Sequence, residues 1–205
     1  MNTRLPKISY SCIILLILVL LGFIQCNQTK YVHPTVMIET SMGDIIVEVY
    51  PDRAPLSASA FLSYVDAGIF KNSSFYRTLN KENQSSASFK TEIIQGGIWE
   101  TNNKKAVSLA GIPHENTKIT TLTHADGAIS LARSTPGSAN TEFFICIGDQ
   151  PRYDYGGTAN PDGQGFAAFG KVVKGMDIVK LINIQPDNNE SLRPPVLISR
   201  ISRLK

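Results

Sequence analysis

The segment Ile69 to Arg77 reads IFKNSSFYR, and after a gap it is followed by IIQGG at Ile93 to Gly97. Two further segments follow in order, TEFFIC at Thr141 to Cys146 and FAAFGK at Phe166 to Lys171. The last three are short apolar runs bounded by turn-forming residues, which is typical of strands. None of the four carries a recognisable nucleophile with its base or a set of metal ligands. The fold and the chemistry therefore have to be inferred from the segments together.

The chain before these segments predicts a hairpin followed by a helix. Thr35 to Thr40 and Asp44 to Tyr50 are runs rich in β-branched residues, and Gly43 lies in the turn between them. Ser57 to Asp66 then shows apolar residues at helical spacing, and Gly68 ends the pattern. We expect two antiparallel strands and a first helix.

The rest of the chain predicts two more strands and a second helix. Ala128 to Ala132 and Val196 to Leu204 are expected strands, and Gly175 to Ile184 is an expected amphipathic helix. Short strands with only two helices favour a mainly β fold, a closed antiparallel barrel capped by two α-helices. Asn80 to Lys90 and Glu100 to Lys118 are long and polar, and the first is expected to form a mobile surface loop.

Composition limits the possible functions. The 205 residues, 42% hydrophobic and 18% charged, suffice for a signal segment and one domain with a substantial core. The net charge of +3 is small and the basic residues are scattered, so we expect no nucleic-acid partner. A peptide ligand is the better hypothesis, and we expect a monomer.

The N-terminus differs from the rest of the chain. Arg4 and Lys7 precede an apolar run from about Cys12 to Ile24, which is too short for an ordinary membrane span and fits a signal peptide. Cys26 follows at once, in a pattern that resembles a bacterial lipoprotein signal. We therefore expect a signal peptide with a lipidation site over residues 1–26, a polar tether over 27–34 and the folded domain over 35–205.

Two alternatives to a lipid anchor at Cys26 stay open. Gln25 stands where the lipoprotein pattern usually has a small residue, so a secreted soluble product or a retained membrane anchor is also compatible with the sequence. All three place the domain outside the cytoplasm, and a lipid-anchored protein of the bacterial envelope is the preferred hypothesis. Cys146 is expected to be a buried hydrophobe without chemistry.

Several classes of enzyme find no support. His33, His114 and His124 are isolated and lack the spacing of zinc ligands, so no metal site is expected. No GxSxG, HExxH or phosphate-binding glycine loop occurs. A hydrolase or a lipocalin-like carrier therefore has no motif in its favour.

Taken together and in this order, the four segments resemble those of cyclophilins, which are peptidyl-prolyl isomerases. The resemblance extends over residues 35–205 and implies an eight-stranded barrel, no cofactor, and binding of proline-containing polypeptide segments. It implies catalytic positions at Arg77 and Gln95, which would lie over the bound proline. Alone, an arginine after two aromatic residues would be interpreted as a solvated surface charge.

The resemblance also implies the residues that bind the substrate. Phe144 matches the aromatic floor under the proline ring, Ile93 an apolar wall, and Ala132 and Arg133 a shelf whose backbone pairs with the peptide. Three further positions of the binding surface depart from the common pattern. They are Glu142 in place of glutamine, Tyr153 in place of leucine and Phe166 in place of histidine.

The sequence thus predicts a prolyl isomerase that acts in protein folding outside the cytoplasm. Glu92 replaces a phenylalanine of the pocket wall, and Phe89 or Trp99 is expected to rebuild that corner. These departures leave an alternative open, a cyclophilin-like module that binds peptides or acts as a chaperone with little isomerase activity.

Overall fold

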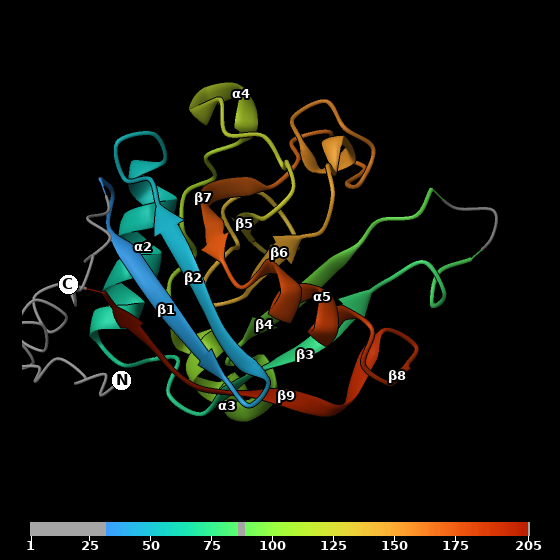
Figure 1. Cartoon of the computed structure of the whole chain (residues 1–205). Coiled ribbons are helices and arrows are strands. Elements are labelled where there is room, and N and C mark those ends of the chain that lie inside the picture. The colour runs from blue at the N-terminus through green and yellow to red at the C-terminus, as the bar shows by residue number, and fades with distance from the viewer. Residues whose placement is uncertain (1–31, 86–88, 205) are drawn as a thin grey trace, which may run out of the picture. The chain divides into compact units, whose positions relative to one another are not determined.

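Eight strands close into an antiparallel barrel in the computed structural model, which describes residues 32–85 and 89–204. Around the barrel the order is β1-β2-β7-β5-β6-β4-β3-β9, and β9 pairs with β1 to close it (Figure 1). The short β8 pairs with β9 alone. The strands are β1 (Thr35–Thr40), β2 (Gly43–Val49), β3 (Ser73–Leu79), β4 (Ile93–Gly97), β5 (Ala128–Leu131), β6 (Phe143–Cys146), β7 (Ala167–Lys174), β8 (Asp187–Asn188) and β9 (Ser191–Arg203).

The predicted fold class is confirmed, with more helix than expected. The two expected helices are present, and α3 and α4 are additional to them among the described residues. Both overlap the long polar segment 100–118, for which the sequence predicts no element. The helices are α2 (Pro55–Asp66), α3 (Trp99–Ser108), α4 (Thr117–Thr120) and α5 (Met176–Asn183), and Pro151–Tyr153 forms the 3₁₀ turn η1.

Alternation along the strands divides their side chains between the core and the outer face. On β6, Phe143 is fully buried in the main core, whereas its neighbour Phe144 belongs to a second, smaller apolar cluster. On β4, Ile94 likewise belongs to the main core and Ile93 to the second cluster. The smaller cluster forms the base of the site described below.

A group of phenylalanines fills the main core. Phe61 of α2 lies 4.9 Å from Phe169 and 5.7 Å from Phe143 between ring centroids, and Phe75 of β3 lies 5.8 Å from Phe143. Offset and edge-to-face rings at these distances stabilise a core beyond the area that they bury. The helix α2 is thereby fixed to the barrel through Phe61.

The strand β3 was not predicted, and it contains an irregularity that orients the site. Phe75 pairs with Gly96 and Arg77 pairs with Gln95, so Tyr76 is an extra residue opposite β4. A β-bulge of this kind reverses the alternation of the strand beyond it. Phe75 therefore faces the core, while Arg77 lies on the same outer face as Gln95.

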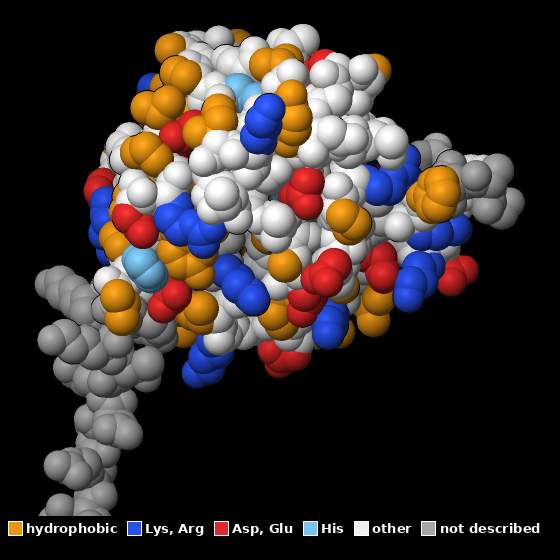
Figure 2. All heavy atoms as spheres, turned by 90° about the horizontal axis from the view of Figure 1, so that it is seen from above, with side chains coloured by type: hydrophobic (Ala, Val, Ile, Leu, Met, Phe, Trp, Pro, Cys, Tyr) orange, Lys and Arg blue, Asp and Glu red, His pale blue; other side chains and the backbone are white. Residues whose placement is uncertain are grey.

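The face of the molecule seen in Figure 2 carries lysine, arginine, aspartate and glutamate side chains interspersed with one another. That face therefore has no continuous basic area of the kind that nucleic-acid binding requires. Within residues 32–85 and 89–204, no helix combines the length and the hydropathy needed to span a bilayer. The expected signal peptide and the lipidation site at Cys26 lie outside the described residues.

Candidate active site

A pocket of about 780 Å³ opens on the outer face of β3, β4 and β6. Phe144 and Ile93 supply its apolar base, and Arg77 and Gln95 stand on the adjoining strands. All nine residues expected to act on or bind a substrate line this pocket, although their sequence separations reach 89 positions, from Arg77 to Phe166. They are Arg77, Ile93, Gln95, Ala132, Arg133, Glu142, Phe144, Tyr153 and Phe166.

The guanidinium of Arg77 is held on two sides. Its Nε and Nη2 donate to Oε2 of Glu190 at 3.0 and 2.7 Å, and its Nη1 donates to Oε1 of Gln95 at 3.0 Å. A guanidinium has five N–H donors, so these contacts leave one on Nη1 and one on Nη2 that no described residue takes. The side chain is 39% exposed, which allows a ligand to reach those donors.

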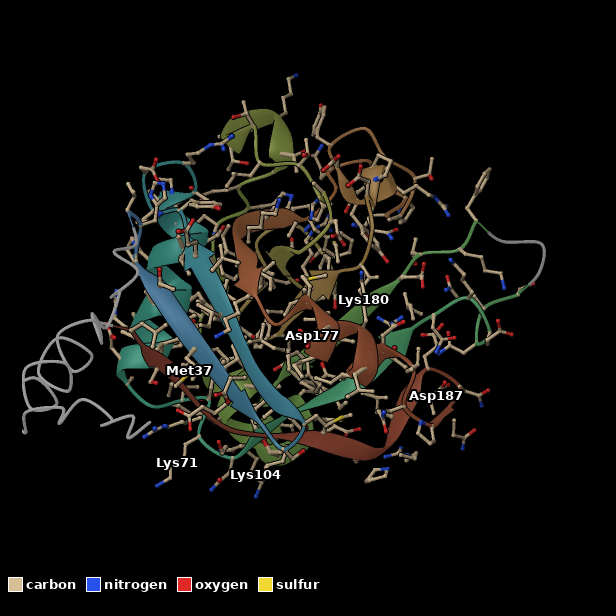
Figure 3. The ribbon with its side chains drawn as sticks, viewed as in Figure 1. Met37, Lys71, Lys104, Asp177, Lys180 and Asp187 are labelled. Carbon is tan, nitrogen blue, oxygen red and sulfur yellow. The ribbon has the colours of Figure 1, made fainter. Side chains whose placement is uncertain are left out.

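Glu190 was not recognised from the sequence. It lies in the turn between β8 and β9, where Asn189 and Glu190 both have positive φ, 50° and 70°. The backbone N–H of Glu190 donates to Asp187, labelled in Figure 3, and its carbonyl accepts from the N–H of Thr78 at 2.8 Å. Left-handed backbone at a non-glycine residue costs free energy, so the turn depends on these contacts to present Glu190 to Arg77. No motif in the sequence marks this position.

The aromatic base rests on a buried histidine. The ring of His124 stacks on Phe144 with centroids 5.8 Å apart, and its two nitrogens lie 2.7 Å from Asp154 Oδ1 and 3.0 Å from Ser130 Oγ. The ring is buried beneath the pocket and does not line it. His124 therefore supports Phe144, and we assign it no contact with a ligand.

Tyr153 and Phe166 extend the base into an aromatic corner. Their rings pack edge to face on each other at 5.3 Å, and Phe144 lies 5.1 Å from Phe166 and 5.3 Å from Tyr153. The Tyr153 hydroxyl donates to Thr91 at 3.1 Å, and burial raises the pKa of that hydroxyl. The corner is thus apolar, with its one polar group satisfied.

At the rim, Arg133 holds the loop that follows η1. Its guanidinium makes a bidentate pair with Asp162 at 2.8 and 2.9 Å, donates to the carbonyl of Gly165, and lies 5.4 Å above the ring of Phe166. The pKa of Asp162 falls to about 2 because of these hydrogen bonds from Arg133. Beside it, the backbone N–H of Ala132 donates to the carbonyl of Glu142 at 2.8 Å. The expected pairing of this shelf with a peptide stays a prediction.

The corner expected to be rebuilt by Phe89 or Trp99 is lined by both. Glu92 does not line the pocket; its carboxylate lies 3.4 Å from Lys81, and Thr91 and Ile93 on either side of it face the pocket.

Within the described residues, no group of three or more His, Cys, Asp or Glu side chains is arranged to hold a metal ion.

The fold and the site define a closed antiparallel barrel with an arginine beside an apolar pocket on its outer face. A family model described as cyclophilin-type peptidyl-prolyl cis-trans isomerase matches residues 35–203. A peptidyl-prolyl cis-trans isomerase of Acinetobacter baylyi is 33% identical, over 81% of each chain. Peptidyl-prolyl cis-trans isomerase B of Escherichia coli is 32% identical over 72% of this chain and 82% of its own.

Solved structures agree on the fold. A crystal structure of a cyclophilin-type peptidyl-prolyl cis-trans isomerase of Cryptosporidium parvum superposes with a TM-score of 0.64, at 20% identity, over 84% of this chain and 98% of its own. The chain belongs to the cyclophilin-type peptidyl-prolyl cis-trans isomerase family, and its enzyme class is that of a peptidyl-prolyl isomerase.

Proposed function

We propose that the pocket binds proline-containing polypeptide segments and that Arg77 catalyses rotation about the X-Pro bond. The proline ring rests on Phe144, and the two N–H groups that Arg77 keeps free face the bound peptide bond. The observation that carries the proposal is how the Arg77 donors are distributed. Three of its N–H groups fix the guanidinium to Glu190 and Gln95, and two are left for a ligand. In support, a structure of the C. parvum protein was solved in the presence of the dipeptide Ala-Pro.

Arginine suits this reaction for a physical reason. The barrier of about 18 to 20 kcal/mol arises because the nitrogen lone pair is delocalised into the carbonyl. A donor aimed at the prolyl nitrogen stabilises the twisted state, in which that lone pair is localised, more than the planar state. Arg77 stays charged at ordinary pH, so it donates without transferring a proton. A hundred-thousand-fold acceleration requires a reduction of only about 7 kcal/mol.

The setting that we propose is protein folding outside the cytoplasm. Uncatalysed X-Pro isomerisation takes tens to hundreds of seconds, which is slow enough to limit folding. The support is the sequence of residues 1–26, with its apolar run and Cys26. The protein is then an isomerase attached to the bacterial envelope by a lipid on Cys26.

The activity is tested with a proline peptide whose cis and trans forms differ in a spectroscopic or proteolytic signal. Wild type accelerates the exchange, and Arg77→Ala lowers this acceleration by about 100-fold or more while the far-ultraviolet circular dichroism is unchanged. Arg200→Ala is the matched control, because Arg200 also pairs with a carboxylate, Glu39 at 2.6 Å, and does not line the pocket. A wild-type protein that binds the peptide without accelerating its isomerisation would instead be a peptide-binding module.

The anchor has a separate test. The mass of the mature protein, expressed with its own N-terminus in a bacterium, is expected to equal the chain from Cys26 plus lipid. A mature chain that begins at another residue, or an unmodified Cys26, refutes the lipid anchor and leaves the enzymatic proposal intact.

A further inference from the structure

A chain of hydrogen bonds connects Arg77 to a buried carboxylate. Arg77 Nη1 donates to Oε1 of Gln95 at 3.0 Å, Gln95 Nε2 donates to the Tyr76 hydroxyl at 2.9 Å, and that hydroxyl donates to Oε2 of Glu142 at 2.7 Å. Two strands contribute three of the residues, Arg77 and Tyr76 from β3 and Gln95 from β4, and Glu142 directly precedes β6. Every bond in the chain points from Arg77 toward Glu142.

The chemistry of the two ends fixes that direction. An arginine can only donate and an ionised carboxylate can only accept. Gln95 must therefore turn its carbonyl toward Arg77 and its NH₂ toward Tyr76. Tyr76 accepts that bond, so its single hydrogen is left for Glu142. A glutamine amide and a tyrosine hydroxyl could each point either way by themselves, and the charged ends remove the choice.

Glu142 is itself held in place. Its Oε1 accepts from the backbone N–H groups of Ile98 and Trp99 and from the Thr141 hydroxyl, all at 3.0 Å. The residue is 9% exposed. Gly97, with φ of 146°, makes room for it, because a Cβ at that position would lie 2.5 Å from both carboxylate oxygens. Because three donors occupy Oε1, the Tyr76 hydroxyl donates to Oε2.

We propose that Glu142 is a positioning residue of the isomerase, which acts through Tyr76 and Gln95 to keep the Arg77 guanidinium aimed at the pocket. This rests on the proposed role of Arg77. Glutamine, which is common at this position in cyclophilins, offers both a donor and an acceptor, so it does not fix the direction of the hydrogen bonds. Glu142 and Tyr76 thus function as a pair, and contact of Glu142 with substrate stays a separate prediction.

Protonation of Glu142 breaks the same chain. A proton on Oε2 turns that oxygen into a donor facing a hydroxyl that needs an acceptor. Burial raises the pKa of Glu142 above its ordinary value of 4.5, so this occurs at a higher pH than for an exposed glutamate. Tyr76 on β3 is the titratable side chain that contacts the carboxylate among the described residues. The other groups that contact the carboxylate do not titrate: they are the backbone N–H groups of residues 98 and 99 and the hydroxyl of Thr141. The charged Arg77 lies at the opposite end of the series of hydrogen bonds.

The test compares Glu142→Gln, Tyr76→Phe and their double variant in the proline-peptide assay. Each single variant is expected to lower kcat about tenfold with a smaller change in KM, because a donor that is less well oriented loses transition-state stabilisation more than binding. The double variant is expected to be no worse than the poorer single variant, because both break one chain. Wild-type kcat falls on acidification, and this acid limb is absent from both single variants.

Glu115→Gln is the matched control. Glu115 is a second buried carboxylate, 5% exposed, that accepts two backbone N–H bonds, from Leu56 and Ser57, and it does not line the pocket. Its variant reports the cost of removing a buried charge that caps a helix. We expect it to keep wild-type kcat and the acid limb. A loss of thermal stability equal to that of Glu142→Gln with wild-type kcat in both variants would reduce Glu142 to a structural cap.

A readout without catalysis separates this inference from the proposed function. The side-chain amide signals of Gln95 in ¹⁵N–¹H spectra are expected to shift with pH in wild type and to lose that shift in Tyr76→Phe. If the wild type is inactive, the proposed function fails whatever the spectra show. If wild type is active and Arg77→Ala is not, then additive losses in the double variant or an acid limb in Tyr76→Phe overturn the positioning role.

Discussion

Arg77 and Arg133 line the same pocket and each pairs with a carboxylate, but they are used differently. Arg77 is 39% exposed, pairs with Glu190 at 2.7 Å and keeps two N–H groups free of described partners. Arg133 is 1% exposed and directs four donations to Asp162 and Gly165. An arginine next to a ligand site is therefore available for chemistry only where its partners leave donors unused. Arg133 shapes the rim, and Arg77 can act.

The largest effect is expected from Arg77→Ala. Loss of one preorganised donor lowers kcat/KM by about 100-fold or more. The side chain is partly exposed, so the melting temperature is expected to stay within a few degrees of wild type. A fall in kcat/KM of this size without a loss of stability supports the distinction between Arg77 and Arg133. A variant that keeps wild-type kcat/KM contradicts it.

Arg133→Ala is expected to act mainly on stability. It removes the hydrogen bonds to the Gly165 carbonyl and the packing on Phe166, so the free energy of unfolding falls by about 2 kcal/mol. The rim loop loosens, and KM for a proline peptide rises more than kcat falls. Urea unfolding and steady-state kinetics measure the two effects. If kcat falls as far as in Arg77→Ala, the distinction between the two arginines is wrong.

Glu190→Ala removes the carboxylate that orients Arg77. We expect kcat/KM to fall about tenfold, because the guanidinium keeps its charge and its bond to Gln95 but loses two of its three fixed contacts. Glu190→Gln, which can still accept a hydrogen bond, is expected to recover part of the loss. Equal activity of the alanine variant and wild type would show that Gln95 alone suffices.

The smallest effect concerns pH and Asp162. Its pKa of about 2 in the folded protein lies below the ordinary 3.8. A depressed pKa stabilises the fold above pH 3.8, and this contribution is lost as the pH falls toward 2. Asp162→Asn is therefore expected to flatten the pH dependence of the melting temperature in that window. If the melting temperature of Asp162→Asn depends on pH as it does in wild type, the pair between Asp162 and Arg133 does not contribute to stability in this window.

The barrel, its first hairpin and the pocket residues were accessible from the sequence because they depend on local patterns and on segments that resemble a known family. Helix α3 was not accessible. Ala106 alone of its residues is buried, and its first N–H groups are capped by Glu142, 43 residues further along the chain. The polar composition at 100–118 therefore gave no helix signal, and a carboxylate distant in sequence caps the start of the helix.

The partners of Arg77 were hidden for the same reason. Glu190 lies 113 residues beyond Arg77, in a turn without a glycine signal, and Tyr76 gained a role only through contacts with Gln95 and Glu142. A sequence shows which residue types are present, and here the tertiary contacts decide which of them fix the arginine.

The bulge at Tyr76 allows Phe75 and Arg77 to face opposite sides of the sheet, although their spacing of two would place them on one face of a regular strand. Replacing Tyr76 alters one side chain and keeps the bulge, whereas deleting it would make Phe75 and Arg77 direct neighbours in a regular ladder, opposite Gly96 and Gln95. Two variants that both lack the tyrosine ring should therefore both keep Arg77 on the outer face, and they should differ in whether β3 keeps its bulge. Insertions in the β3–β4 connection leave this arrangement unchanged, because they lie beyond the paired residues.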